Sequence, residues 1–281
     1  MSLQHRIQDL CAGFSGTAGV AARNLTSAES VAVNDAESFP TASMIKIVIL
    51  FELVRACARG QAQMWERITL RAQDKTIGSG LMADFDEGTS LTLRDLAVMM
   101  MGISDNTATN MLIDRLGIGA VNQACREAGM LHTELRGKVD FDRIRESSSN
   151  LAVSTPADFV HFLTGLRRGE LLALPYVEQM LGIMRIQKYM GQTLRRYLPY
   201  DPYALEFGEP QDMWIASKTG GLSGVRTEAG IIHTASAEWV VCVCTKGYTK
   251  TEAGSDDPGS RFIAEASRAI FEAWSVAPAE R

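Results

Sequence analysis

The stretch TASMIKIVILFELVRACARG, residues 41–60, is the most informative part of this sequence for its fold. Thr41 can cap a helix that runs from about Ser43 to Arg59 and is closed by Gly60. The stretch therefore predicts one long helix with a serine in its first turn and a lysine one turn later.

Ser43 and Lys46 lie three residues apart, so both side chains share one face of that helix, with about 5–6 Å between their Cβ atoms. A serine hydroxyl is a poor nucleophile at neutral pH and needs a nearby base. A lysine can be that base if burial and a neighbouring positive charge lower its pKa. The partial positive charge of the helix N-terminus also suits a developing oxyanion.

Two further polar motifs follow in the chain. A Ser-Asp-Asn triplet, residues 104–106, lies between helices predicted over 91–101 and 107–116. A Lys-Thr-Gly triplet, residues 218–220, follows the apolar run 213–217 and is therefore predicted on a strand. Together with the first pair they supply a nucleophile, a base, a proton relay and a cationic anchor.

Each motif has an ordinary structural interpretation when it is taken alone. The first pair can be a helix start with a solvated lysine, and the third can be an edge strand with another. The second can be a turn between helices with Asn106 or Thr107 as the helix cap. The occurrence of all three in this order favours the catalytic interpretation.

This set of motifs resembles that of the class A β-lactamases and related penicillin-binding serine hydrolases. The resemblance runs from about Gly19 to the C-terminal helix. It implies that Ser43 is the nucleophile and Lys46 its activator. It also implies that Ser104 relays a proton to the leaving nitrogen and that Asn106 donates its amide to the acyl side chain of the substrate.

For the third motif the resemblance implies that Lys218 holds positive potential beside the relay serine and that Thr219 hydrogen-bonds a substrate carboxylate. The backbone N–H groups of Ser43 and Gly221 would form the oxyanion hole. Gly220, like Gly221, permits close approach of the backbone. Two further implied roles are a turn fixed by Asp105 and a substrate carboxylate bound by Arg226.

One segment of the class A pattern is missing. Those enzymes carry a Glu-x-x-Leu-Asn segment whose glutamate activates the deacylating water, and this sequence has none. Asp140 is the first candidate to replace the glutamate, and Asp142 and Glu146 are alternatives. All three can equally be solvated loop carboxylates.

The pattern of elements predicts an α/β protein, with an antiparallel sheet flanked by helices plus an all-α domain, as in β-lactamases and transpeptidases. Residues 1–40 and 208–281 would form the discontinuous α/β domain and residues 41–207 the all-α domain, with the active site at their junction. Residues 199–211 are the predicted linker or mobile rim. The predicted strands cover residues 19–24, 29–34, 213–217, 230–233 and 238–245, and further helices cover 3–14, 155–168, 171–185 and 260–274.

Composition excludes several classes of function. A net charge of −5 over 281 residues, without a basic stripe, argues against a nucleic-acid surface. The longest apolar run, 45–54, contains two charged residues, so no membrane span is expected. We expect no cofactor and no metal, because none of the histidines, His5, His132, His161 and His233, has metal-ligand spacing.

The five cysteines, an odd number without dense spacing, predict no disulfide framework. Cys242 and Cys244 are expected to share one face of a strand as small core residues. The sequence as it stands is expected to be cytoplasmic, or periplasmic or secreted if a signal peptide was removed. The sequence does not indicate an oligomeric state.

These observations predict a serine hydrolase that acts by acylation of Ser43 on a small molecule, either a β-lactam or a related amide or ester. The alternatives are a D-alanyl-D-alanine-type peptidase, an esterase and a glutaminase-like amidase. A non-catalytic penicillin-binding protein is the alternative from another functional class.

Overall fold

The largest sheet of the protein is built from both ends of the chain, as predicted. The computed structural model describes residues 1–188, 193–201, 203–208, 212–249 and 256–275. Five antiparallel strands lie in the order β2-β1-β10-β9-β8. Their bounds are β1 (Thr17–Asn24), β2 (Ser30–Val33), β8 (Trp214–Leu222), β9 (Val225–His233) and β10 (Glu238–Lys246).

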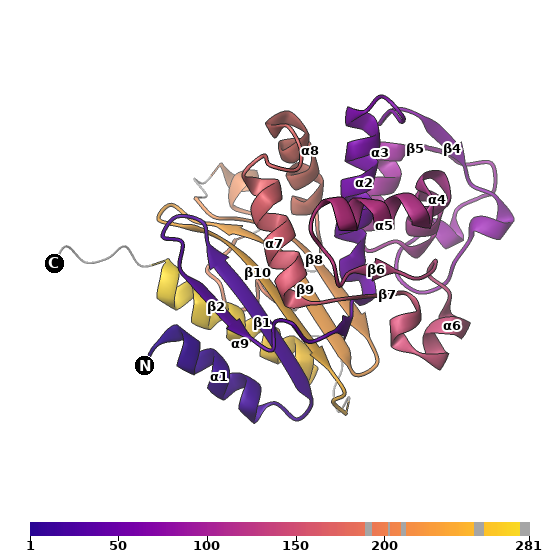
Figure 1. Ribbon diagram of the computed structural model, residues 1–281. Coiled ribbons are helices and arrows are strands. Elements are labelled where there is room, and N and C mark those ends of the chain that lie inside the picture. The colour runs from indigo at the N-terminus through magenta and orange to yellow at the C-terminus, as the bar shows by residue number, and fades with distance from the viewer. Residues whose placement is uncertain (189–192, 202, 209–211, 250–255, 276–281) are drawn as a thin grey trace.

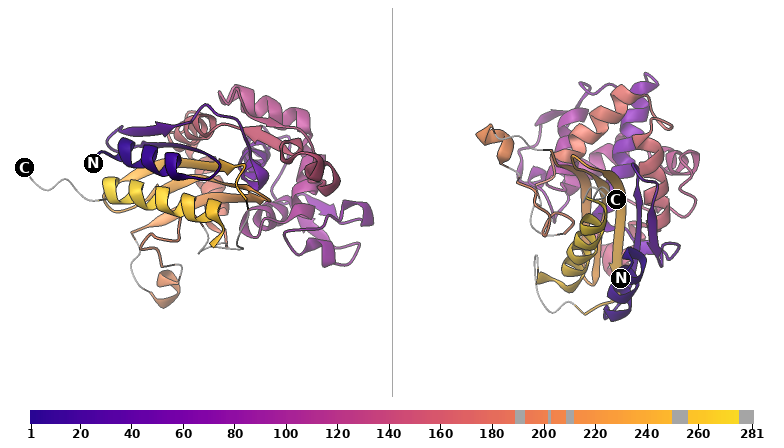
Figure 2. Two further views of the ribbon diagram at one scale, coloured as in Figure 1. Left: turned by 90° about the horizontal axis from the view of Figure 1, so that it is seen from below. Right: turned by 90° about the vertical axis from the view of Figure 1, so that its left-hand side faces the viewer.

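Helices cover both faces of this sheet (Figures 1 and 2). Helices α1 (Leu3–Gly13) and α9 (Pro258–Trp274) pack side by side on one face, and α7 (Pro156–Arg167) packs on β1 and β10 from the other. Along β10, Val241 and Val243 belong to the core beneath α9, whereas Cys242 and Cys244 belong to the opposite core, as their spacing predicted. Burial on both faces explains why this strand is apolar along its length.

Helix α2 (Lys46–Ala58), which begins with Lys46 of the first motif, is contacted by α3 (Leu93–Gly102), α4 (Asn106–Leu116), α5 (Ile118–Glu127) and α8 (Leu174–Arg185). Eleven of its residues are buried, so it is a core helix rather than a surface one. The helices of this part also include α6 (Phe141–Glu146). Small sheets link them, with strands β3 (Phe39–Pro40), β6 (Glu134–Leu135) and β7 (Ala152–Ser154), and β4 (Arg67–Thr69) with β5 (Ser90–Thr92).

Two predictions about helix starts were wrong. Thr41 does not cap a helix with its side chain, because its hydroxyl donates to the carbonyl of Ala42, and the chain enters α2 through a 3-10 turn, Ala42–Ile45. The helix expected from residue 171 begins only at Leu174, after the extended Ala173, with Pro175 in its first turn, where a proline is tolerated.

Other features lie outside the prediction. Helices α5 and α6 were not expected, and α7, which is part of the predicted all-α segment 41–207, packs on the sheet. The expected linker or mobile rim, 199–211, lies partly outside the described residues and otherwise contains a 3-10 turn, Ala204–Phe207. None of the described helices is long and apolar enough to cross a membrane.

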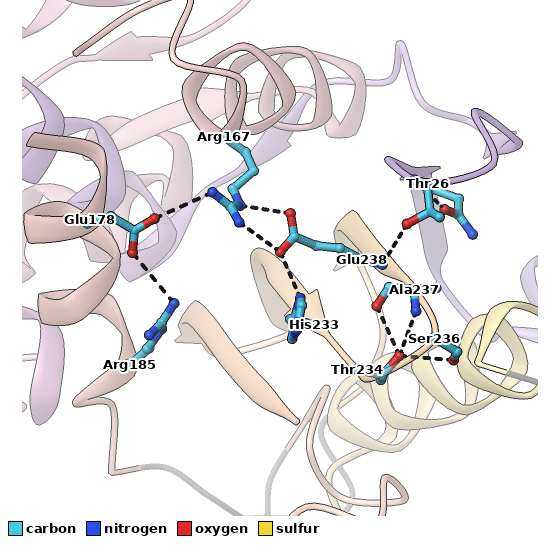
Figure 3. A network of polar contacts seen from close by, with 10 residues as sticks. Thr26, Arg167, Glu178, Arg185, His233, Thr234, Ser236, Ala237 and Glu238 are labelled. Atoms are coloured by element: carbon cyan, nitrogen blue, oxygen red, sulfur yellow. Dashed lines mark hydrogen bonds and ion pairs between the residues drawn. The ribbon is translucent and has the colours of Figure 1, made fainter. Parts of the chain in front are cut away.

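A network of charged side chains connects helices α7 and α8 to the sheet at the turn between β9 and β10 (Figure 3). Arg167 of α7 donates its Nε to Glu238 Oε1 at 2.7 Å and lies 3.4 Å from Glu178 of α8. His233 of β9 lies 3.0 Å from Glu238 Oε2. These contacts therefore hold the β9–β10 turn to helices α7 and α8.

Candidate active site

Ser43 stands in a tight backbone turn against strand β8. Ala42, just before it, has a φ of 45°, in the left-handed region that residues other than glycine rarely adopt. A Cβ on Gly220 of β8 would lie 2.5 Å from the Thr41 carbonyl oxygen and 2.9 Å from the Met44 nitrogen. Only glycine fits there, so the predicted close approach is confirmed for this position.

Lys46 is fully buried and joins the first motif to the second. Its Nζ donates to the carbonyl oxygen of Ser104 at 2.7 Å, to Ser104 Oγ at 3.1 Å and to Asn106 Oδ1 at 3.0 Å. Burial, and then the positive charge of Lys218, lower the pKa of Lys46 well below its usual value, while Asp105 opposes the change. The neutral amine is therefore favoured far more than in water, and it can also accept the Ser104 hydroxyl proton.

The second motif forms a strained turn that Asp105 holds in place. Ser104 has a φ of 60°. Asp105 Oδ2 accepts hydrogen bonds from the nitrogens of Leu81 at 2.7 Å and Met82 at 2.9 Å, and its Oδ1 caps α4 through Ala108 N at 2.8 Å. The cap is thus Asp105, not Asn106 or Thr107, because its carboxylate can serve two chain segments at once.

Asn106 has one amide N–H engaged. Its Oδ1 accepts from Lys46, and its Nδ2 donates to the carbonyl oxygen of Ile77 at 3.1 Å. An asparagine amide has two N–H donors. Among the residues that the structure describes, none accepts from the second donor, which leaves it for the role that the motif predicted, a hydrogen bond to the acyl side chain of a substrate.

Lys218 is the second fully buried lysine of the site. It lies on β8, as predicted, and its Nζ donates to the carbonyl oxygen of Thr219 at 2.8 Å. Burial lowers the pKa of Lys218 to about 7, and the nearby carboxylate of Glu228 opposes the change. Its charge near neutral pH is therefore sensitive to small changes in the site.

A buried polar cluster lies behind this strand, and sequence reasoning missed it. Glu228 of β9 accepts hydrogen bonds from Ser217 Oγ at 2.6 Å, Gln187 Nε2 at 3.3 Å and Leu194 N at 3.0 Å. Gln187 Oε1 in turn accepts from the nitrogen of Thr219 at 2.9 Å and its hydroxyl at 3.0 Å. The signal in the sequence was a lone acidic residue inside an otherwise buried strand.

Arg226 lines the cavity at Ser43, but its charge is already paired. Its Nη1 donates to the carbonyl oxygens of Leu222 and Val225, both at 2.8 Å, and its Nη2 lies 3.4 Å from Oδ2 of the fully buried Asp257. Asp257 therefore reduces the positive potential that Arg226 presents to the cavity, and its binding of a substrate carboxylate stays a prediction.

The segment expected to hold the deacylation base presents apolar side chains to the site. Asp140 Oδ1 accepts from the nitrogens of Asp142 at 3.0 Å and Arg143 at 3.3 Å, so it caps helix α6. Asp140, Asp142 and Glu146 are all exposed. Among the described residues of α6, those that line the cavities at Ser43 are Phe141 and Ile144. This placement argues against Asp140 as the base.

Comparison with known proteins agrees with this architecture. The model of the family described as "Beta-lactamase enzyme family" matches residues 2–274. A beta-lactamase from Sphaerobacter thermophilus has a similar structure, with a TM-score of 0.84 and 29% identity over 99% of this chain and 98% of that one. PBP-A is 28% identical, with a TM-score of 0.82 over 97% of this chain and 96% of that one, and a mutant of it has been solved as an acyl-enzyme complex with penicillin G.

Two curated relatives are more distant in sequence. Beta-lactamase 3 of Bacillus cereus is 24% identical over 97% of this chain and 81% of its own length. The match to Beta-lactamase BRO-1 of Moraxella catarrhalis, at 26% identity, spans 58% of this chain and 52% of that protein.

Proposed function

This chain belongs to the beta-lactamase enzyme family, and on that basis we propose that it is a serine hydrolase of the β-lactamase type in which Ser43 takes the acyl group. The observation that carries the proposal is the position of Lys46. Its amine is fully buried, a single helical turn from Ser43, and held by Ser104 and Asn106.

Acylation would use the residues of all three motifs. Lys46, as the neutral amine, takes the proton of Ser43 Oγ, and the oxygen attacks the carbonyl carbon of the substrate. The oxyanion is stabilised by the N–H groups of Ser43 and Gly221. Ser104 then passes its proton to the leaving nitrogen or oxygen and takes one in turn from the protonated Lys46, to which it is hydrogen-bonded. Lys46 returns to the neutral amine, and the acyl group remains as an ester on Ser43.

Hydrolysis of that ester is expected to be slow. A deacylating water needs a base, and α6 contributes Phe141 and Ile144 to the walls around Ser43. This observation favours penicillin binding with slow turnover over rapid β-lactam hydrolysis. A D-alanyl-D-alanine-type peptidase, an esterase and an amidase would use the same acylation residues.

The test is a chromogenic cephalosporin mixed with the enzyme, followed by absorbance and by intact-mass spectrometry. We expect a burst of about one equivalent and then a steady rate lower than that of an efficient lactamase by about 10²–10⁴-fold, the usual contribution of a general base. One covalent adduct on the peptide that contains Ser43 should accompany the slow phase. Ser43→Ala should lose both burst and adduct.

Fast linear turnover without an adduct would contradict slow deacylation. Alanine changes at Asp140, Asp142 and Glu146 would then show which carboxylate activates water. An adduct that persists in Ser43→Ala would contradict the nucleophile itself.

A further inference from the structure

Two cavities of different chemical character meet at Ser43. The first, of about 420 Å³, is lined mainly by hydroxyl-bearing side chains and by Arg226. The second, of about 330 Å³, has apolar walls formed by Val139, Phe141, Ile144 and Leu151, with Ser79 and Asn106 as its polar side chains beside Ser43. Both cavities share the lining residues Ser43, Ser79, Phe141, Gly221 and Leu222. A substrate attacked at Ser43 Oγ therefore has one half in a polar cavity and the other half in an apolar one.

The motif residues decide which half of the substrate lies in which cavity. Ser104, which would protonate the leaving group, lines the polar cavity. Asn106, whose second amide N–H is available to the acyl side chain, lines the apolar one. The leaving group thus occupies the polar cavity, and the acyl group occupies the apolar one.

No described residue that lines the second cavity carries a charge. Val139 and Leu151 are almost completely buried, and Phe141 and Ile144 are partly exposed in its wall. A charged acyl group placed there would lose its hydration without gaining a partner, whereas an apolar one would bury hydrocarbon surface.

We propose that this second cavity is an acyl pocket that selects substrates with an uncharged, apolar acyl group, aliphatic or aromatic, joined to a polar leaving group. The proposal rests on the proposed acylation of Ser43 and names its substrate class. It disfavours acyl donors that carry an ammonium or carboxylate on the acyl side, such as peptides with charged side chains or amides of free amino acids.

The first experiment measures the rate constant for acylation of Ser43 by p-nitrophenyl acetate, butanoate and hexanoate, each divided by its spontaneous hydrolysis rate. We expect the corrected rate to rise about fourfold with each added methylene until the pocket is full, the factor that about 0.8 kcal/mol per buried methylene gives. The ester of 6-aminohexanoate, matched in length to hexanoate, should react at least tenfold more slowly than hexanoate.

The two proposals fail in different ways. If acetate leaves no adduct on Ser43 by intact-mass spectrometry and is hydrolysed no faster by the wild-type protein than by Ser43→Ala, the proposed function is wrong. If acetate acylates Ser43 but the corrected rates do not rise with chain length, or the aminohexanoate and hexanoate esters react equally, the acyl pocket is wrong and the acylation of Ser43 stands.

Variants place the effect in this cavity. Ile144, unlike Phe141, lines the second cavity and not the first. Ile144→Ser should lower the ratio of hexanoate to acetate rates at least threefold, and Ile144→Leu should restore most of it. Leu131→Ser, a matched change at a side chain 73% exposed and outside the lining of both cavities, should leave the ratio unchanged. An unchanged ratio in a folded Ile144→Ser, with a wild-type circular dichroism spectrum, would overturn the proposal.

Discussion

At the scale of single residues, the site depends on two lysines that the fold keeps away from water. Lys46 and Lys218 are both fully buried, and burial is the largest cause of the lowered pKa of each. A buried cation is costly for folding, and the same cost favours the neutral amine of each lysine. Lys46 is thereby suited to the proposed role of a base, and the charge of Lys218 can change near neutral pH.

The pH dependence of acylation should show both lysines. Acylation falls at low pH as Lys46 takes up a proton and can no longer accept that of Ser43. Above about pH 7, Lys218 loses the charge that attracts a substrate carboxylate, because its pKa is about 7. We expect kcat/KM for benzylpenicillin to decline on this basic side and that for its methyl ester to stay nearly level. Equal decline for the two compounds would remove Lys218 from carboxylate binding.

Lys218 should also make stability depend on pH. Its folded pKa of about 7 lies below the unfolded value of about 10.4, so the unfolded chain binds more protons above pH 7 and stability rises with pH. Urea unfolding should show a gain of about 1–2 kcal/mol attributable to Lys218 between about pH 7 and pH 8.5. Beyond that range, buried thiols with a raised pKa, such as Cys125, oppose it.

Lys218→Met should reduce the rise of the unfolding free energy with pH by the amount attributed to Lys218. Lys188→Met, at an exposed lysine, should leave that rise unchanged. The assignment is untenable if the two variants show the same dependence on pH.

At the scale of elements, strand β8 and the turn at Ser43 form one unit. The Gly220 backbone touches that turn, and Thr227 Oγ1 of β9 donates to the Thr41 carbonyl oxygen at 2.7 Å. The strand therefore positions Ser43, the proposed nucleophile, as well as Lys218. The geometry of the site therefore requires that the sheet and the start of α2 pack in the right relative position.

Gly220→Ala should break this unit. Its new Cβ meets backbone atoms that cannot turn aside, so we expect a loss of about 1–3 kcal/mol in stability and at least tenfold in acylation. Gly182→Ala is the matched control, because that glycine lies in α8 with nothing within 4 Å of the added carbon. It should gain about 0.5–1 kcal/mol and keep full activity. Similar melting temperatures for both variants would contradict the packing argument.

At the scale of the whole molecule, the helices around α2 are joined to the sheet by Arg167, Glu178 and Glu238 (Figure 3). Glu238 is only 14% exposed, so its bond to Arg167 is screened less than a surface pair. Arg167→Met should cost about 1–2 kcal/mol in urea unfolding, as charged hydrogen bonds do. Arg136→Met breaks an exposed pair with Glu134 and should change stability by less than about 0.5 kcal/mol. If the two substitutions lower the free energy of unfolding equally, the Arg167–Glu238 network does not stabilise the junction between the helices and the sheet.

The features that could be predicted from the sequence are those that depend on residues close together in the chain, such as apolar periodicity and motif spacing. Periodic apolar residues gave most helices and the strands of the large sheet, and the spacing of Ser43 and Lys46 gave a shared helix face. The Thr41 hydroxyl bond to Ala42 could not be predicted, because Ala42 adopts a left-handed backbone where this turn packs on β8, and that packing is not visible in local sequence. The Glu228 cluster was missed for a similar reason, since its partners come from distant segments.

The antiparallel pairing of Thr17 with Lys246 sets the order in which a newly synthesised chain can be completed. Strand β1 leaves the ribosome before its central partner β10, which follows about 10–45 s later at about 5–20 residues per second. A two-stranded β1–β2 hairpin is marginal in water during that interval. The nascent protein therefore carries β1 without its partner β10, and Ser43 without the third motif, until residues 214–246 have been synthesised.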